Sequence, residues 1–479
     1  MKTSASLDSN QSWHKSGKLT RVSSQPTNSA GSTSSSVEHY AGQKGKLLRV
    51  LGVGFGLAVT IGGTIGMGIL RTPGEVAKQL PTETLFLSVW LLGGVYALLG
   101  AVSVAELGAM IPRSGGWYVF IQRAMGNYPG FVVGWSDWLS TCGTLGVIAL
   151  VVGEYSAVLI PSLAGRDKAI AVAVVLLFAG LQWRGIRWGS ITQNLTSALK
   201  TLIFVAIAIA AFAITGKTNS GAPTAPAQGF AFFTALIIAL QGVLYTYDGW
   251  YGVIYFGEEV RDPKRDVVRS MFGGVLLVVA IYLVVNLAYV HVLPMSQLAN
   301  ETLPAGAVAR VLVGDYGDKV IRILAILSLL STVNAYTLTA PRILYAMSCD
   351  ELFHRRASRV NKGGTPTVTL FISTVAAILF IVSAKFSTIL AALAFFFVAN
   401  YSMGYISLIV LRFREPDLPR PYRAWGYPWT TLLVLAGSIA FLLGAIRSDK
   451  RNSLMALAIL AVSIPIYLVV RLLSHRQSA

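Results

Sequence analysis

A glycine-broken apolar segment near the start of the chain limits the possible folds more than any other feature. Residues 50–79 are long and apolar enough to cross a bilayer, yet the sequence I-G-G-T-I-G-M-G-I-L places four glycines within residues 61–70. Inside a bilayer, unwound backbone is tolerated only where protein buries it or where it lines a cavity. The segment therefore predicts bare N–H and C=O groups at mid-membrane, held in place by the rest of the chain.

The composition favours a polytopic membrane protein. Of the 479 residues, 54% are hydrophobic and 13% are charged, whereas an average soluble protein has a charged fraction of about 25%. The 39 Lys and Arg residues outnumber the 21 Asp and Glu residues, which in a soluble protein would suggest nucleic-acid binding. Because the basic excess lies in loops between apolar spans, it predicts orientation in the membrane, and no nucleic-acid partner is expected.

About twelve apolar spans follow one another, and membrane lipids are expected to surround them. They lie near residues 50–79, 84–111, 129–160, 168–184, 190–214, 230–257, 270–293, 319–349, 366–384, 387–412, 429–446 and 453–473. Basic residues concentrate on one set of connecting loops, which places both termini in the cytoplasm of a multi-pass protein of the plasma (inner) membrane. Residues 1–45 are rich in Ser, Thr, Gln and Asn and predict a disordered cytoplasmic tail that is not a signal peptide.

A second interrupted span resembles the first in its position. The sequence L-Y-T-Y-D-G-W-Y-G at residues 244–252 places an acid beside a glycine at the centre of an apolar helix, which is costly unless the acid has a function. Broken helices in the first and sixth spans, five apart, are typical of an inverted-repeat transporter with its site at the midplane. We expect an all-α fold with a ten-helix core at residues 46–425, repeats at about 46–215 and 228–412, and two additional helices in residues 426–479.

The chemistry of the two breaks predicts the ligand. The N-terminal end of a half-helix attracts anions and the C-terminal end attracts cations, so an amino acid zwitterion fits between them. The amides of Gly66, Met67 and Gly68 are predicted to bind its carboxylate. Carbonyls near Thr64 and Tyr245 are predicted to bind its ammonium. The alternative is that the glycines only allow close helix packing, but the R-T-P-G sequence after the break favours the binding role.

The second break carries three further candidate residues. Asp248 is interpreted first as the N-cap of the following half-helix, since Asp is a preferred cap. The alternative is that it offers its charge to a substrate ammonium or to a proton. Gly249 belongs to the same predicted substrate site. Tyr245 and Trp250 are candidate aromatic gates, or else residues that only fill the bundle.

A lysine within the fifth span is the candidate coupling residue. Lys200 has apolar residues beyond it, so it must face the interior, pair, or lose its proton. It could cycle protons, or it could be a fixed cation in place of bound sodium; a lysine that snorkels towards the helix end is the remaining alternative. Asp137, Glu154 and Arg342 are further ionisable residues of the spans, and we expect them to pair within the bundle.

Four motifs together point to a known family. They are the glycine break, A-E-L-G-A-M-I-P-R-S-G-G at residues 105–116, Y-D-G-W with G-E-E-V-R-D-P-K-R at residues 247–250 and 257–265, and R-P-Y-R at residues 420–423. From about residue 47 to the C-terminus, the chain resembles the amino acid–polyamine–organocation superfamily of permeases, and most closely its L-type amino acid transporter branch. The resemblance implies the five-plus-five inverted repeat and recognition of the α-amino acid group by the two breaks.

The same resemblance bears on coupling and on partners. Lys200 matches a lysine that fills the second sodium position in several members, which implies a sodium-independent carrier. Met67 stands where the family usually has a small residue, which affects the size of the pocket. Heteromeric members carry a cysteine between the third and fourth spans for a disulfide to a heavy chain. Residues 155–168 contain no cysteine, so a stand-alone carrier is expected.

We therefore expect a secondary active amino acid transporter that works by alternating access, coupled by proton symport or by exchange. A polyamine or organic-cation carrier is an alternative, although it would favour more acids along the path than Glu106, Asp137 and Asp248. A membrane sensor that binds an amino acid without moving it is another, with the Ser-rich tail as its output. The sequence shows no metal-ligand spacing, phosphate loop or nucleophile motif, so neither a cofactor nor an enzymatic activity is predicted.

Overall fold

The chain is almost entirely helical in the residues that the structure describes. The structure is a computed structural model, and it describes residues 46–213, 228–383, 386–448 and 450–478. The predicted tail at residues 1–45 lies outside these ranges. Three isolated β-bridges join single pairs of described residues. The predicted all-α class is therefore confirmed.

The helices follow the predicted spans along the chain. The α-helices are α1 (Val53–Thr64), α2 (Gly68–Gln79), α3 (Glu83–Met110), α4 (Trp117–Met125), α5 (Asn127–Leu159), α6 (Asp167–Trp183), α7 (Ile186–Ala213), α8 (Phe230–Thr246), α9 (Pro263–Val292), α10 (Met295–Asn300), α11 (Pro304–Val313), α12 (Gly317–Cys349), α13 (Thr367–Ser383), α14 (Phe386–Arg414), α15 (Trp429–Ser448) and α16 (Lys450–Ser478). Short 3₁₀ helices are η1 (Pro161–Leu163), η2 (Gly252–Tyr255), η3 (Gly314–Tyr316) and η4 (Arg355–Ser358).

Length and hydropathy identify membrane spans among these helices. Within the described residues, seven helices are long and apolar enough to cross a membrane, or eight spans if the bent pair α1–α2 counts as one. Shorter apolar helices lie at Phe230–Thr246, Thr367–Ser383 and Ala456–Val470. Each predicted span has a helix or a broken pair in its place, so the polytopic architecture is confirmed, while the number twelve stays a prediction.

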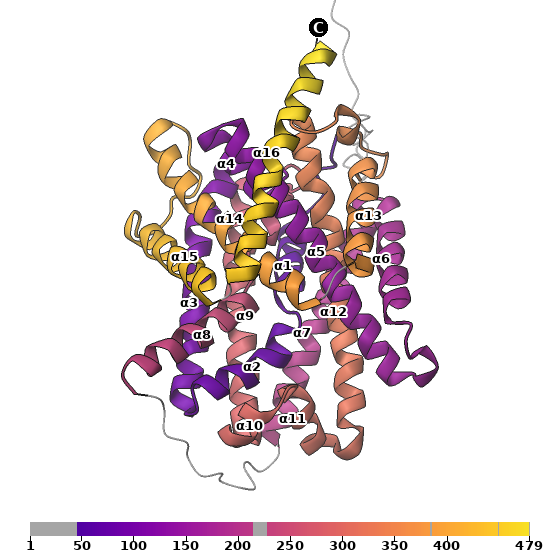
Figure 1. Ribbon diagram of the computed structural model, residues 1–479, viewed down its shortest axis with the longest axis vertical. Coiled ribbons are helices and arrows are strands. Elements are labelled where there is room, and N and C mark those ends of the chain that lie inside the picture. The colour runs from indigo at the N-terminus through magenta and orange to yellow at the C-terminus, as the bar shows by residue number, and fades with distance from the viewer. Residues whose placement is uncertain (1–45, 214–227, 384–385, 449, 479) are drawn as a thin grey trace, which may run out of the picture. The chain divides into compact units, whose positions relative to one another are not determined.

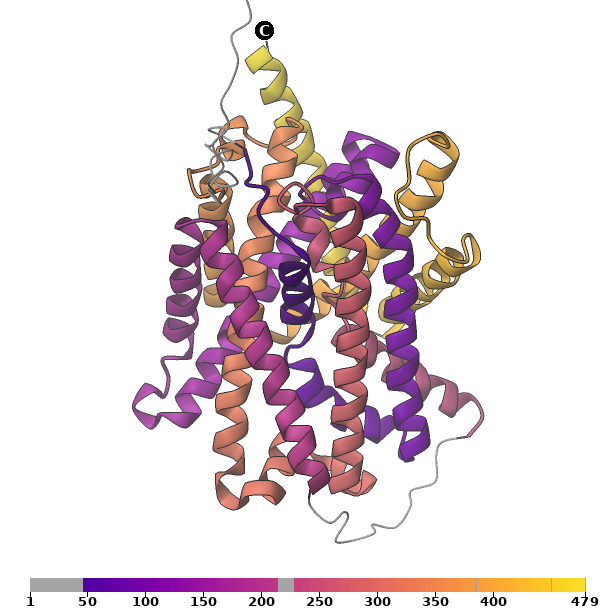
Figure 2. The same ribbon diagram turned by 180° about the vertical axis from the view of Figure 1, so that it is seen from behind.

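The broken pair α1–α2 lies in the middle of the helices (Figures 1 and 2). α1 packs against α7, α9 and α12, whereas α2 packs against α8 and α10. The two are bent by 47° at their junction, so α2 runs obliquely to α1. α15 packs against α3 and α14, and α16 against α14 and α5. The last two helices thus pack on α3, α5 and α14, whereas the α1–α2 break is surrounded by α7, α8, α9, α10 and α12.

Helix α7 shows how the sequence selects the inward face of a span. Its buried residues recur every three or four positions and include Gly189, Gln193, Ser197 and Lys200. Large apolar side chains such as Leu195 are exposed on the opposite face. Polar groups in a membrane helix are stabilised in the protein interior, and apolar side chains are stabilised by lipid, so this face must point to α1 and α12. Lys200 is brought to the break in this way.

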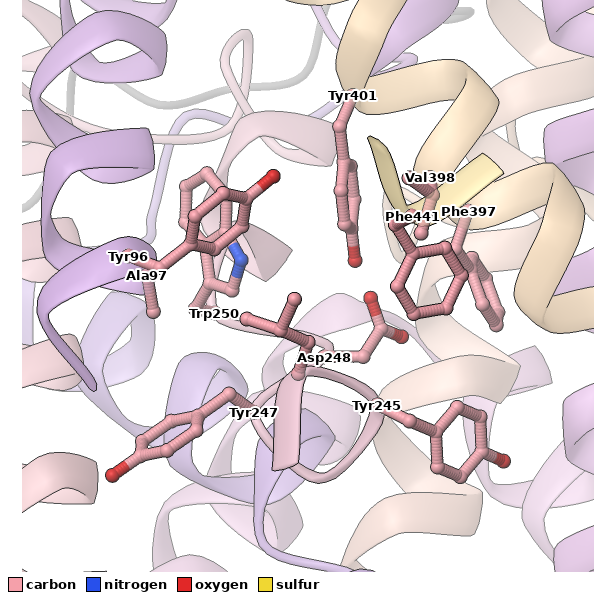
Figure 3. A pocket seen from close by; sticks show the side chains of 11 residues that line it. Tyr96, Ala97, Tyr245, Tyr247, Asp248, Trp250, Phe397, Val398, Tyr401 and Phe441 are labelled. Atoms are coloured by element: carbon pink, nitrogen blue, oxygen red, sulfur yellow. The ribbon is translucent and has the colours of Figure 1, made fainter. Parts of the chain in front are cut away.

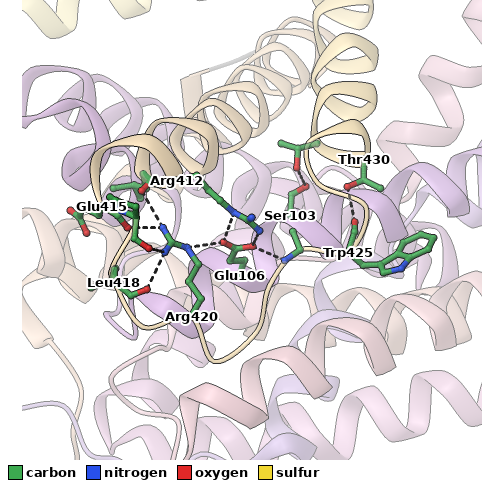
Figure 4. Close-up of polar contacts among 12 residues, drawn as sticks. Ser103, Glu106, Arg412, Glu415, Leu418, Arg420, Trp425 and Thr430 are labelled. Carbon is green, nitrogen blue, oxygen red and sulfur yellow. Dashed lines mark hydrogen bonds and ion pairs between the residues drawn. The ribbon is translucent and has the colours of Figure 1, made fainter.

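Ion pairs fasten the end of the bundle that carries α4. The fully buried Glu106 of α3 accepts bonds from Arg412 at 2.9 and 2.6 Å, from Arg420 at 3.1 Å and from the amide of Ala424 at 2.6 Å (Figure 4). These contacts join α3, α14 and the segment after α14. Arg113 makes a separate ion pair with Asp350 at 2.8 Å.

Candidate functional site

The first break leaves backbone amides outside both helical ladders. Ile65 N–H donates to the Ile61 carbonyl at 2.9 Å, as the last hydrogen bond of α1. The amides of Leu70 and Arg71 donate to the Met67 carbonyl at 3.1 and 3.2 Å, as the first bonds of α2. The amides of residues 66–68 lie between the two ladders, where a helix start leaves its N–H groups without intrahelical partners. The break is where the sequence predicts it; its use for a carboxylate stays a prediction.

A cavity of about 280 Å³ lies at this break. Its lining residues come from the α1–α2 pair, α5, the α8 break, α12 and α14: Gly63, Thr64, Gly66, Met67, Gly68, Arg71, Thr72, Thr144, Val147, Ile148, Val151, Tyr245, Thr246, Asp248, Thr332, Tyr336 and Phe397. The structure thus brings every predicted substrate residue except Gly249 to one cavity. Gly249 lines a smaller cavity beside it, which shares Gly63 and Tyr336 with the large one.

The two glycines of the predicted carboxylate cradle have different surroundings. A Cβ atom built on Gly66 would meet nothing within 4 Å. A Cβ atom on Gly68 would lie 2.7 Å from Cγ2 and Oγ1 of Thr246. Close helix packing, the alternative role of the glycines, therefore applies to Gly68, where α2 approaches α8. Gly66 borders open space, so a substitution there tests the predicted binding role without disturbing helix packing.

We expect Gly66→Leu to abolish substrate binding while the protein still folds. The added side chain would occupy cavity space beside the free amides, and no packed atom stands where its Cβ would go. Thermal shift of the purified protein with a panel of amino acids measures the loss of stabilisation. Gly54→Leu is the matched control, because Gly54 is an exposed α1 glycine with nothing within 4 Å of its Cβ position. A Gly66→Leu variant that keeps wild-type ligand stabilisation would refute the cradle.

One tyrosine of α9 bridges the two breaks. The Tyr282 hydroxyl contacts the carbonyls of Thr64 at 2.9 Å and Thr246 at 3.0 Å. The Tyr245 carbonyl accepts a bond from the Asp248 amide at 3.2 Å. The Tyr245 carbonyl also accepts from the Tyr247 amide, so of the two predicted ammonium acceptors the Thr64 carbonyl is the one that keeps a second lone pair. The sequence gives no sign of Tyr282, because a tyrosine inside an apolar helix is usually core.

The interpretation of Asp248 as a helix N-cap is wrong. α8 ends at Thr246, residues 247–251 form turns, and the 3₁₀ helix η2 that follows has no side-chain cap. The carboxyl instead accepts a hydrogen bond from the Tyr251 hydroxyl at 3.4 Å and lines the large cavity. The reason is Gly249, whose φ of +101° turns the chain where a Cβ would lie 2.8 Å from the Gly63 carbonyl carbon. Asp248 therefore presents its carboxyl group to the cavity.

Trp250 sits in an aromatic cluster beside the break. It is 3% exposed, and its ring centroid lies 6.5 Å from Trp117, 5.4 Å from Tyr251 and 6.0 Å from Tyr401. Figure 3 shows Trp250 and Tyr245 at an apolar cavity into which the Asp248 carboxyl and the Tyr401 hydroxyl point. Tyr245 also lines the large cavity. Their gating stays a prediction.

Lys200 reaches the first break from α7. Its side chain is 1% exposed, which excludes snorkelling. The ammonium donates to the carbonyls of Gly62 at 3.0 Å and Ile65 at 2.5 Å, and to the hydroxyl of Thr332 at 3.0 Å. These acceptors use all three N–H donors of a charged lysine. Thr332 of α12 is a partner that the sequence did not reveal.

The expectation that Asp137, Glu154 and Arg342 pair within the bundle is confirmed for Arg342 and wrong for the two acids. Arg342 forms a buried ion pair with Glu259, with Nε–Oε2 at 2.5 Å and Nη2–Oε1 at 2.8 Å. Asp137 accepts hydrogen bonds from Tyr255, and Glu154 is exposed. Tyr255 and Glu259, the partners of Asp137 and Arg342, both lie in the segment after the second break.

Comparison with known proteins identifies the family. The family described as Amino acid permease matches residues 56–465, which include both breaks and Lys200. The chain belongs to the amino acid permease family. It is accordingly an integral, multi-pass membrane transporter of amino acids rather than an enzyme, as the sequence predicted.

Named relatives of this permease cover most of its length. The serine/threonine exchanger SteT of Bacillus subtilis is 30% identical over 432 residues, covering 88% of this chain and 96% of the relative. The b(0,+)-type amino acid transporter 1 of Homo sapiens is 28% identical over 393 residues, covering 79% of each chain. The Asc-type amino acid transporter 1 of Mus musculus is 26% identical over 398 residues, covering 80% of this permease and 74% of the relative. These relatives agree with the predicted L-type branch.

Proposed function

We propose that this permease carries amino acids across the plasma membrane by alternating access and without sodium. The observation that carries the proposal is the ammonium of Lys200, bound to two carbonyls of the first break and to Thr332. Unwound carbonyls at such breaks coordinate the coupling cation in sodium-driven carriers. In this permease the Lys200 ammonium binds those carbonyls, so no sodium ion is needed to supply a positive charge there.

Lys200 acts as a fixed charge rather than a proton carrier. In a neutral amine, two N–H donors would remain for the two carbonyls, and the new lone pair would compete for the Thr332 hydroxyl proton with the Ile65 and Ser328 carbonyls, both 3.4 Å from Thr332 Oγ1. A buried acceptor without a hydrogen bond costs about 1–3 kcal/mol. This favours a lysine that stays charged through the cycle, and transport then proceeds by exchange or couples to protons at another residue.

The cavity wall favours a neutral amino acid as substrate. Val147, Ile148, Val151 and Phe397 form an apolar side, where a substrate side chain would lie. The lining includes one acidic residue, Asp248, and one basic residue, Arg71. The cavity therefore has no excess of acidic side chains, which disfavours a polyamine. Serine or threonine, exchanged by the bacterial relative, would fit a cavity narrowed by Met67. Tyr245 and Trp250 are proposed to close over the substrate.

We propose further that the permease works without a disulfide-linked heavy chain and has both termini in the cytoplasm. α5 ends at Leu159 and α6 begins at Asp167, and the connection between them contains no cysteine. The segments that carry the basic excess, including residues 261–269 at the start of α9 and residues 355–362, belong to the side predicted to be cytoplasmic.

Counterflow in proteoliposomes tests the proposed function. Vesicles loaded with unlabelled serine should accumulate labelled serine at the same initial rate when potassium or choline replaces sodium on both sides. Protein-free vesicles are the control. A strict sodium requirement would contradict the role of Lys200. Ligand stabilisation of the purified protein without any flux would favour the membrane sensor instead.

A further inference from the structure

A second ionisable site lies between α5 and η2, apart from Lys200. Asp137 is fully buried, about 15 Å along α5 from its start at Asn127. Its two carboxyl oxygens accept hydrogen bonds from one hydroxyl, that of Tyr255, at 2.9 and 3.1 Å. The hydroxyls of Ser140 and Thr141 donate to the Asp137 backbone carbonyl instead, at 2.9 and 2.7 Å.

The surroundings of Asp137 offer no compensating positive charge. No lysine, arginine or histidine in the part of the chain that the structure describes forms an ion pair with it. The titratable groups that face it are Tyr251, Tyr255, Tyr336 and Asp248. The remaining elements packed around this part of α5 contribute uncharged side chains: Tyr118 of α4, Ser373 of α13, Asn400 of α14 and Tyr467 of α16. An ionised carboxyl buried in this way is costly, and a proton removes the charge.

A small, mainly apolar cavity that carries several hydroxyl groups lies beside this site and beside the substrate cavity. The smaller cavity is lined by Thr141 and Tyr255 on one side, and by Gly63 and Tyr336, which also line the large cavity, on the other. Tyr251 lines it too and donates to Asp248 at 3.4 Å. The Tyr251 and Tyr255 hydroxyls thus bond the two carboxyls at either end of this cavity, and its volume of about 20 Å³ has room for about one water molecule to relay a proton between them.

We propose that Asp137, hydrogen-bonded to Tyr255, is the proton-binding site that couples this permease to a proton gradient. The inference rests on the proposed function and adds the coupling residue that a fixed charge at Lys200 leaves open. One proton from water in the cavity adds to a carboxyl oxygen, and the same proton leaves to the other side of the membrane later in the cycle. No other bond is made or broken.

Protonation of Asp137 would change the hydrogen bond by which Tyr255 holds η2 to α5. With Asp137 ionised, the Tyr255 hydroxyl makes charge-assisted bonds, which are roughly twice as strong as neutral ones. With Asp137 protonated, the bond is neutral and η2 is held less firmly against α5. Since η2 follows the second break, this couples proton binding to movement of the broken span.

Proton uptake in proteoliposomes tests the proposal. Wild-type vesicles with a pH-sensitive dye inside, in choline buffer without sodium, should acidify when serine is added, and an inside-alkaline gradient should drive serine accumulation. Asp137→Asn should lose both, with proton uptake reduced at least tenfold, and its serine affinity should no longer depend on pH. Glu154→Gln, an exposed acid on the same helix, should behave as the wild type.

A second variant keeps the test decisive if Asp137→Asn does not fold. Tyr255→Phe removes the hydroxyl donor to the carboxylate, so the ionised form is less stable. The pH profile of uptake should then move to higher pH by roughly one unit. A merely structural contact would lower the rate without moving the profile.

Three outcomes would overturn the proposal. Wild-type counterflow without proton uptake would leave the proposed function standing and remove the proton site. Proton-driven accumulation retained in Asp137→Asn would place the site elsewhere. Uptake that requires sodium, and loses this requirement in Asp137→Asn, would make Asp137 a sodium ligand. Failure of wild-type counterflow altogether would instead contradict the proposed function.

Discussion

Lys200→Ala is expected to reduce the initial rate of sodium-free counterflow by roughly 100-fold or more. The substitution removes the lysine donor from the carbonyls of Gly62 and Ile65 and from the Thr332 hydroxyl, and the Ile65 carbonyl keeps one longer contact, with Thr332 Oγ1 at 3.4 Å. Each unpaired buried acceptor costs about 1–3 kcal/mol, and about 1.4 kcal/mol corresponds to a tenfold effect. The break would no longer hold the geometry that binds substrate, so both affinity and flux should fall.

Two additional measurements make the Lys200 prediction specific. Lys168→Ala is the matched control, because Lys168 is exposed and donates to one carbonyl, that of Val382; its counterflow should stay near the wild-type rate. Sodium should restore part of the rate in Lys200→Ala and have no effect on the wild type, since a free cation can reach the vacated carbonyls. A Lys200→Ala variant with wild-type counterflow would reduce Lys200 to a packing residue.

Glu106→Gln is expected to cause the largest loss of stability. The substitution removes the negative charge that serves Arg412 and Arg420, of which Arg420 is 4% exposed. Removing one partner of a buried ion pair typically costs 3–5 kcal/mol, because the other charge stays buried without compensation. The apparent Tm in detergent should fall by roughly 3–5 °C for a chain of this length.

Glu415→Gln is the matched control for this effect. Glu415 pairs with Arg123, and both side chains are about one-third exposed. A pair of this kind contributes about 0–1 kcal/mol, so the Tm should change little. Unfolding followed by intrinsic fluorescence on both variants gives the comparison. Equal shifts for Glu106→Gln and Glu415→Gln would mean that the buried cluster in Figure 4 has no special part in stability.

The broken first helix and the inward lysine could be predicted because a membrane leaves few alternatives. Glycines in a span predict unwound backbone, and a lysine such as Lys200 must find acceptors inside the protein. Local sequence also predicted the helices on either side, since apolar runs of this length have no other stable form in lipid. The predicted amino acid ligand was inferred from the half-helix ends, whereas the individual carbonyls that bind Lys200 could not be predicted from the sequence.

The pairings within the bundle could not be predicted, because they join residues far apart in sequence. Tyr255 is 118 positions from Asp137, and Arg342 is 83 positions from Glu259. Apolar helices carry no register signal that fixes which faces meet. The Asp248 interpretation failed for a different reason: a cap requires a helix after it, and the tight approach of Gly249 to Gly63 prevents one from starting there.

Because Gly249 approaches Gly63 through main-chain atoms, the geometry of this crossing does not depend on which side chains line the substrate cavity. At this crossing the two broken spans meet through main-chain atoms, and side chains of other helices, Lys200 and Tyr282, hold the breaks in place. Side chains of the cavity wall, such as Met67 and Val151, can therefore vary without disturbing it. We therefore expect substitutions in the cavity wall to change substrate preference, between homologues or under directed selection, without altering the main-chain crossing of the two breaks.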